Sequence, residues 1–215
     1  MTLVNVFRIA VAPEDKPLLH EVGVHNLRTS HREEPGTLAM FVAERKDQEG
    51  SFIVFEIYEN EATYAIHRAS EQFNNYVTKA GPKLTDRTAL QVEPVFLQEK
   101  LPSGEWVGAE HYFMKFARVQ TSLAGQADFE TSVMTNMKLS LEKEEGVLAM
   151  YAVREKADAT VWYFYEVYAS PEAYESHRQT EHFKTYIAET QDLVTNKELL
   201  DLVNDASMTQ GKLGE

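Results

Sequence analysis

Alternating apolar and polar positions predict a strand at the start of each half of the chain. Apolar side chains recur at about every second position of 3–11 (LVNVFRIAV) and of 112–121 (YFMKFARVQT). A segment with apolar residues at helical spacing follows each strand, and Gly36 or Gly146 then gives the backbone the freedom to turn into the next strand. Each half therefore begins with a strand and a helix.

Two further strands in each half are apolar on both faces. They cover 37–45 and 51–58 in the first half, and 147–154 and 160–168 in the second, with DQEG and KADA as hairpin turns. A strand that is apolar on both faces must be covered on both. Helices can cover one face, so we expect the other half of the chain to cover the second.

A second helical region, 60–80 or 170–190, completes each half together with a last strand at 88–96 or 198–203. Both regions break near their middle, at Ser70 and Thr180, and Asn60 and Ser170 are the predicted N-caps. The order strand–helix–strand–strand–helix–strand occurs twice, which predicts an α+β fold of two tandem ferredoxin-like modules.

The two halves are an internal repeat. An offset of 110 residues aligns 36–76 with 146–186 without a gap, and 13 of these 41 positions are identical. We expect module 1 at 1–97, a linker with Pro102 and Gly104 at 98–110, module 2 at 111–204 and a polar tail at 205–215.

Charge and composition restrict the partners. The formal net charge of −13, from 34 acidic and 21 basic residues, disfavours nucleic acid and anionic membranes. Cysteine is absent, which excludes disulfides, thiolate metal sites and cysteine nucleophiles. The first residues lack the features of a signal peptide, and no apolar run is long enough to span a bilayer. We expect a cytoplasmic protein with a small-molecule partner.

The sequence resembles the antibiotic biosynthesis monooxygenase superfamily of dimeric α/β barrels. The motifs that carry the resemblance are EEPGTLAMF with FEIYENEATYAIHRASEQF, and EEGVLAMY with YEVYASPEAYESHRQTEHF. Members usually pair two identical chains into a barrel, so the resemblance implies that the two modules form an intrachain, pseudo-dimeric α/β barrel here. The chain is then a monomer or a further homodimer. The superfamily includes cofactor-free oxygenases, haem-degrading enzymes and isomerases.

The candidate catalytic groups are Glu56 with His67, and Glu166 with His177. Side chains alternate along a strand, so Glu56 and Tyr58 share one face, as do Glu166 and Tyr168. A histidine on the following helix can meet each pair and act as a base that the glutamate orients. The alternative is structural: the glutamate binds backbone amides or an arginine, and the histidine is a hydrogen-bonded, half-buried residue.

Other positions are candidates for substrate binding. His182 has no counterpart in module 1, where Gln72 stands, and strand 160–168 is more aromatic than its equivalent. These differences favour module 2 as the active one. The predicted substrate-binding residues are Tyr58, Tyr168, Asn26, Asn136, His182, Met40 and Met150, although methionines at core spacing commonly belong to the core.

No cofactor motif is present, and we expect neither a cofactor nor a metal. In haem-degrading relatives the iron-binding histidine lies four residues after the phenylalanine that aligns with Phe73 or Phe183. This chain has Val77 or Ile187 there, and neither can ligate iron. A metal site at His177 and His182, five residues apart, requires a helix break between them and a third ligand.

Three functions remain open. The preferred one is a cofactor-independent monooxygenase that acts on a small aromatic or quinol substrate with dioxygen. The second is an isomerase of a small phosphorylated carbonyl compound, similar to the autoinducer-degrading branch, with Arg118, Lys115 or Arg178 binding the phosphate. The third is a ligand-binding protein without turnover.

Overall fold

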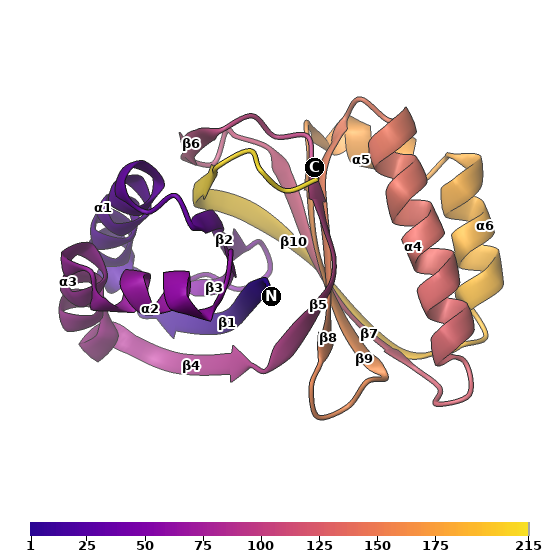
Figure 1. Cartoon of the computed structure of the whole chain (residues 1–215), viewed down its shortest axis with the longest axis horizontal. Helices are drawn as coiled ribbons and strands as arrows, with labels where there is room; N and C mark the ends of the chain where they lie inside the picture. Colours follow the sequence, from indigo (N-terminus) through magenta and orange to yellow (C-terminus); the bar gives the residue numbers. More distant parts are fainter. Residues whose placement is uncertain (215) are drawn as a thin grey trace.

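The strands form one sheet of ten in the computed structural model, which describes residues 1–214. Along the sheet their order is β4-β1-β3-β2-β10-β7-β9-β8-β5, and β6 pairs with β10. The helices of each repeat lie on the outer side of its own half of the sheet (Figure 1). Within the described chain, no helix is long and apolar enough to cross a membrane.

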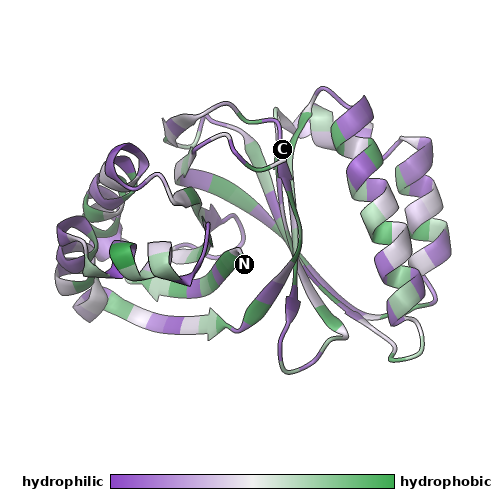
Figure 2. Ribbon diagram, in the orientation of Figure 1, coloured by the Kyte–Doolittle hydropathy of each residue, from purple (hydrophilic) through white to green (hydrophobic). Residues whose placement is uncertain are grey.

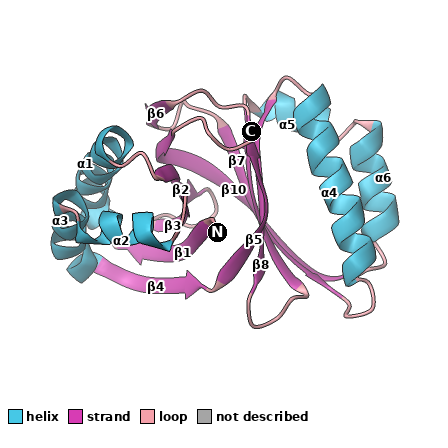
Figure 3. Ribbon diagram, in the orientation of Figure 1, coloured by secondary structure: helices cyan, strands magenta, loops and turns pink. Residues whose placement is uncertain are grey.

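Both repeats have the predicted order of helices and strands, and the α+β class of two tandem ferredoxin-like modules is confirmed. Module 1 contains β1 (Leu3–Val11), η1 (Pro13–Asp15), α1 (Lys16–Glu33), β2 (Thr37–Arg45), β3 (Ser51–Tyr58), α2 (Glu61–Ala69), α3 (Glu71–Ala80), η2 (Gly81–Lys83) and β4 (Leu84–Leu90). Module 2 contains β7 (Phe113–Thr121), α4 (Gln126–Lys143), β8 (Val147–Glu155), β9 (Val161–Tyr168), α5 (Pro171–His177), α6 (Glu181–Thr190) and β10 (Val194–Thr209). Figure 3 shows the helices and strands of both modules.

The breaks and caps of the second helical regions are also as predicted. Asn60 Oδ1 accepts from Thr63 N at 3.1 Å, and Ser170 Oγ accepts from Ala173 N at 3.2 Å. These oxygens satisfy amides that the first helical turn leaves unpaired.

The last strand of each module crosses to the other module. β4 pairs with β1, and the chain then continues as β5 (Val92–Glu99), which pairs with β8 of module 2. In return β10 pairs with β7 up to Leu202 and with β2 of module 1 from Leu202 to Thr209. The exchange joins both halves along two seams and forms the pseudo-dimeric barrel within one chain.

Three predicted boundaries are wrong because of this exchange. The strand predicted at 88–96 is split between β4 and β5. The predicted linker 98–110 contains the end of β5 and a short strand, β6 (Gly104–Val107), which pairs with β10. The predicted polar tail 205–215 begins inside β10. Its polar side chains do not require solvent, because they form hydrogen bonds within the structure: Ser207 Oγ donates to Asn204 Oδ1 at 2.6 Å.

The centre of the molecule is an apolar core that both modules share. Phe41 and Phe55 of module 1 lie against Tyr151 and Tyr165 of module 2, with ring centroids 5.2–5.7 Å apart, and all four are fully buried. Hydrophobic positions follow the strands through this centre, while hydrophilic positions gather on the outer turns of the helices (Figure 2). The prediction that each module covers the second face of the other is confirmed.

Removal of one shared ring is expected to destabilise both modules at once. Phe41→Ala leaves a cavity against Tyr151 and Tyr165 and is expected to lower the free energy of unfolding by about 3–5 kcal/mol. Urea unfolding followed by tryptophan fluorescence and by circular dichroism measures the change. The exposed control Leu123→Ala is expected to change it by about 0.5 kcal/mol or less. Two separate transitions, only one of them shifted, would contradict a shared core.

Candidate functional site

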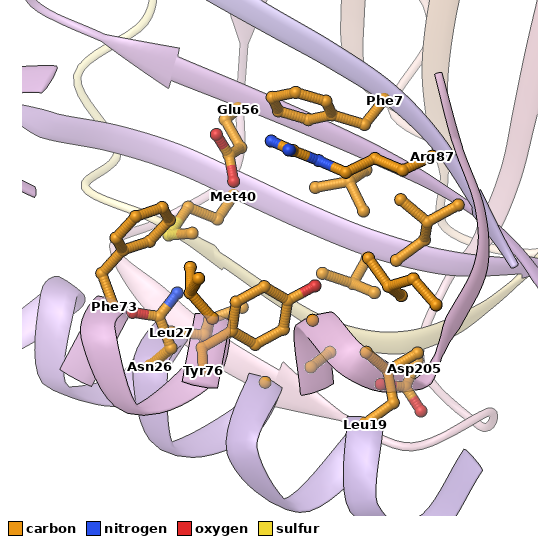
Figure 4. Close-up of a pocket in the computed structure, with 18 of the residues that line it drawn as sticks. Phe7, Leu19, Asn26, Leu27, Met40, Glu56, Phe73, Tyr76, Arg87 and Asp205 are labelled. Atoms are coloured by element: carbon orange, nitrogen blue, oxygen red, sulfur yellow. The ribbon is translucent and has the colours of Figure 1, made fainter. Parts of the chain in front are cut away.

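A cavity of about 200 Å³ lies between the sheet and the helices of module 1. Its walls come from β1, β2, β3, β4 and the end of β10 on the sheet side and from α1, α2 and α3 on the other (Figure 4). Most of the lining is apolar and includes Phe7, Leu19, Leu27, Met40, Val54 and Phe73. The polar groups are Asn26, Glu56, Tyr64, Tyr76, Arg87 and Asp205. An apolar space with a few convergent polar groups is typical of a small-molecule site.

Glu56 is the buried acid of this cavity. It projects from β3 toward the helices and is 8% exposed, and Tyr58 donates a hydrogen bond to its Oε2 at 3.1 Å. Burial raises the pKa of Glu56, although the charge of His67 and the hydrogen bond from Tyr58 offset part of that effect. Glu56 and Tyr58 share one face of β3, as predicted, and this face lies under the helices. A carboxylate in this environment is a stronger base than one in water.

Arg87 and Tyr76 complete the polar side of the cavity. The Arg87 guanidinium lies 5.3 Å from the centre of the Phe7 ring and extends toward Glu56 (Figure 4). Burial raises the pKa of Tyr76 to about 12, so its hydroxyl stays protonated and able to donate. Asn26 is 6% exposed and its Oδ1 has no hydrogen-bond partner. The cavity therefore offers an acceptor, a cation and a hydroxyl donor around an apolar space.

The predicted Glu56–His67 pair does not form. His67 Nδ1 lies 2.8 Å from Oε2 of Glu34, the C-cap residue of α1. His67 is 0% exposed and does not line the cavity. Thr37 and Gln72 also donate to Glu34, at 2.8 and 2.5 Å. Burial raises the pKa of Glu34, but the hydrogen bond and charge of His67 outweigh it and hold that pKa below the usual value.

These contacts make a clamp that we call the Glu34 clamp, formed by Glu34, Thr37, His67 and Gln72. It connects the end of α1 to β2, α2 and α3, and so fixes the helices over the cavity. Sequence reasoning missed Glu34 as a partner. The signal was present, because an acidic residue precedes the glycine in both repeats, as Glu34 before Gly36 and Glu144 before Gly146.

Larger side chains fill the equivalent space in module 2. Leu19, Gly23 and Val54 correspond to Phe129, Val133 and Phe164 at the repeat offset. Phe129 is 0% exposed, and Trp162 stacks on Phe164 with centroids 6.1 Å apart. The aromatic strand that favoured module 2 as the active module therefore fills its interior. We place the candidate site in module 1 instead.

The other predicted residues separate into two groups. Met40 and Asn26 line the cavity, and Tyr58 lies behind Glu56. In module 2, Tyr168 repeats the hydrogen bond to Glu166, at 2.8 Å, and Met150 is fully buried in the packed interior. His177 pairs with Glu144 rather than Glu166, at 2.9 Å. Asn136 and His182 line a different cleft, of about 410 Å³, along α4 and α6.

Module 2 nevertheless contributes to the module 1 cavity through β10. Asp205 and Ala206 line the cavity from the part of β10 that pairs with β2. Asp205 also lies 2.8 Å from Nδ1 of His20 on α1. Sequence reasoning assigned these residues to a tail, because nothing local in the sequence shows that a strand crosses to the other repeat.

Comparison with known proteins agrees with this architecture. The sequence profile of the family described as antibiotic biosynthesis monooxygenase matches residues 2–79 and 113–189. Comparison with curated proteins finds no match.

Solved structures with the same fold span the whole chain. A candidate monooxygenase from Lactobacillus acidophilus is 24% identical with a TM-score of 0.90, over 98% of this chain and 97% of the other. One from Fusobacterium nucleatum is 18% identical with a TM-score of 0.89, over 100% and 96%. An anthrone oxidase-like protein is 14% identical with a TM-score of 0.61, over 100% and 99%.

The buried charge of Glu56 has a measurable cost in stability. Folding raises the pKa of Glu56. The protonated form of Glu56 therefore favours the folded state. This contribution to the free energy of unfolding is complete below the pKa of Glu56 in the unfolded chain and is lost as the pH rises through its pKa in the folded protein. Glu56→Gln removes this titration and keeps an oxygen that accepts from Tyr58. We expect the variant to gain stability relative to wild type as the pH rises from 4 to 8.

Urea unfolding at several pH values in this range measures the difference. Glu142→Gln, an exposed residue near the end of α4, is the control and is expected to show little pH-dependent gain. A difference between Glu56→Gln and wild type that is constant with pH would show that Glu56 titrates normally in the folded protein.

Proposed function

This chain belongs to the antibiotic biosynthesis monooxygenase family, and on that premise we propose that module 1 oxidises a small phenol or quinol with dioxygen, without an organic cofactor. The observation that carries the proposal is the buried carboxylate of Glu56 in an apolar cavity beside Arg87. Module 2 then has a supporting role, because it supplies one wall of the cavity and half of the shared core.

The size of the cavity supports a small substrate. An apolar cavity of about 150 Å³ holds benzene, and ligand pockets for larger molecules measure about 300–1,000 Å³. The present cavity, of about 200 Å³, accommodates one ring or a compact fused pair. It leaves no space for a flavin or haem beside such a substrate. Val77, at the position where haem-degrading relatives carry their iron ligand, contributes an aliphatic wall.

Glu56 is the proposed base and Arg87 the proposed charge stabiliser. Glu56 accepts the hydroxyl proton of the substrate, and the positive charge of Arg87 stabilises the resulting phenolate. Tyr58 donates to the Glu56 carboxylate and positions it. In this scheme Glu56, and not the predicted His67, is the base. His67 acts indirectly, because it belongs to the Glu34 clamp that holds the helices over the cavity.

The oxidation balances without a further reductant. The phenolate gives one electron to dioxygen, and the resulting radical pair forms a carbon–oxygen bond. The peroxide anion takes the proton back from Glu56, and loss of water breaks the oxygen–oxygen bond and leaves a quinone. One oxygen atom enters the product and the other leaves as water. The substrate supplies all the electrons.

The isomerase alternative has less support. The cations proposed for a phosphate site are engaged elsewhere: Lys115 forms an ion pair with Asp201, and Arg178, the C-cap of α5, lies 3.4 Å from Glu175 of that helix. Arg118 donates to Gln120 at 3.4 Å. Binding without turnover remains an outcome of the experiments below.

Oxygen consumption tests the proposed reaction. Wild-type protein with a panel of quinols and dihydroxynaphthalenes is expected to consume one dioxygen per quinone formed, measured with an oxygen electrode and by quinone absorbance. Glu56→Gln is expected to reduce kcat by about 100-fold or more, because it removes the base. Glu166→Gln, the same change in the filled module, is expected to retain turnover. Binding of these compounds without oxygen uptake would contradict the oxygenase and favour a binding protein.

Filling the cavity tests its location independently of the chemistry. A Cβ at Gly23 has no heavy atom within 4 Å, so a side chain there grows into free space. Gly23→Val copies Val133 of module 2 and is expected to raise KM or abolish ligand binding while the folded state is retained, since valine is at least as compatible with a helix as glycine. Gly23→Ala is the smaller step and is expected to have an intermediate effect. Unchanged KM in both variants would place the substrate elsewhere.

A further inference from the structure

Module 2 contains a cluster of three metal-ligating side chains outside the proposed oxygenase site. Glu144 Oε1 lies 2.9 Å from His177 Nδ1 and 2.6 Å from His182 Nε2. The carboxylate oxygen and the two ring nitrogens all lie within 4.8 Å of one another. Two imidazoles thus converge on one carboxylate oxygen.

The break between α5 and α6 makes this convergence possible. α5 ends at His177, and Thr180 then begins α6 by accepting from Phe183 N at 3.3 Å. His182 therefore lies in the first turn of a new helix. Glu144 arrives from the end of α4 as the third ligand. The helix break that the sequence predicts at Thr180 is present, and so is a third ligand, Glu144, which the sequence did not identify.

Packing fixes the orientation of one histidine and leaves a path to the other. His177 is 2% exposed, and its ring lies between Tyr168 and Phe183, with centroids 5.6 and 4.8 Å away. The side chains of His182 and Glu144 are 11% and 13% exposed. His182 also lines the cleft along α4 and α6, which gives a cation a route from solvent.

We propose that Glu144, His177 and His182 bind one divalent transition-metal cation, with Zn²⁺ the best match. Two imidazole nitrogens and one carboxylate are a ligand set that Zn²⁺ accepts with an open fourth position. Mg²⁺ and Ca²⁺ prefer oxygen ligands and are disfavoured. The cation takes the place of the hydrogen bonds between the two imidazoles and the Glu144 carboxylate.

The charges around the cluster favour a cation on balance. Lys100 is an opposing charge beside the cluster, and its Nζ donates to the Glu144 backbone carbonyl at 2.5 Å. Glu181 and Glu189 line the cleft beside His182 and outweigh the single positive charge of Lys143 there.

Module 1 provides an internal comparison. The Glu34 clamp has the same glutamate and histidine, but Gln72 stands where module 2 has His182 and donates to Glu34 at 2.5 Å. An amide nitrogen does not ligate a metal, so module 1 keeps the hydrogen bonds without the site. The proposal therefore predicts one cation per chain, and His182→Gln restores a combination that already folds in module 1.

Zinc binding to the full-length, untagged protein tests the proposal. After treatment with a chelator and buffer exchange, calorimetric titration with ZnCl₂ is expected to show one site per chain. His182→Gln is expected to weaken binding at least 10-fold while the circular dichroism spectrum is unchanged. Co²⁺ in place of Zn²⁺ is expected to give visible absorption bands in wild type that His182→Gln loses.

Surface histidines are the necessary control. In the part of the chain that the structure describes, the other imidazole–carboxylate pairs with some exposure are His20 with Asp205, His31 with Glu105 and the looser pair His111 with Glu110, at 3.4 Å. His20→Gln with His31→Gln is expected to leave the zinc affinity unchanged. Equal binding by wild type and His182→Gln, loss of binding in the His20/His31 variant, or no binding by wild type would each overturn the site. None of these outcomes depends on oxygenase turnover.

Discussion

The apolar contact between the two halves of the sheet is the constraint on which the rest of the structure depends. Strands β2, β3, β8 and β9 are apolar on both faces, so neither module can bury its strands with its own helices alone. The rings of Phe41, Phe55, Tyr151 and Tyr165 fill the space between the halves. The exchange of β5 and β10 follows from this contact, because each strand continues the sheet of the module against which it already lies. Asp205 reaches the module 1 cavity only through that exchange.

With the inner faces fixed by each other, the helix-facing sides were free to diverge. Module 2 fills this side with Phe129, Val133 and Phe164, which adds buried apolar area and stabilises the common core. Module 1 keeps Gly23 and smaller aliphatic residues, and it buries the carboxylate of Glu56 beside an unfilled space. Both features cost stability. The filled module can offset that cost because the two modules share one core.

The sequence predicted what depends on local pattern. Alternation placed Glu56 and Tyr58 on one face, and short polar side chains at Asn60 and Ser170 located the helix starts. It did not predict Glu34 as the partner of His67, because that contact joins the end of one helix to two others that are distant in sequence. The strand at 205–209 was missed for a related reason: its polar residues bond to groups on other strands, and their partners are not visible locally. The cavity could not be predicted because it depends on the combined volume of all the side chains that line it. A small residue such as Gly23 shows free space only once the packing around it is known.

The clamps beneath the helices diverged differently from the cavities. Glu34 and Glu144 occupy equivalent positions in the two repeats. Each glutamate pairs with the equivalent histidine of its own module, His67 or His177. Simple retention of the clamp would explain Gln72 in module 1, because an amide is a sufficient donor to a buried carboxylate. It does not explain His182, which brings a second imidazole to the same oxygen and adds a group that can exchange its proton for a metal. Module 2 therefore lacks the interior space that module 1 keeps, and it has, beside a separate cleft, a group of two histidines and a glutamate that module 1 lacks. The two modules can differ in this way because the shared core between their inner faces stabilises the fold. The helix-facing sides contribute less to that core, so their side chains can differ between the modules.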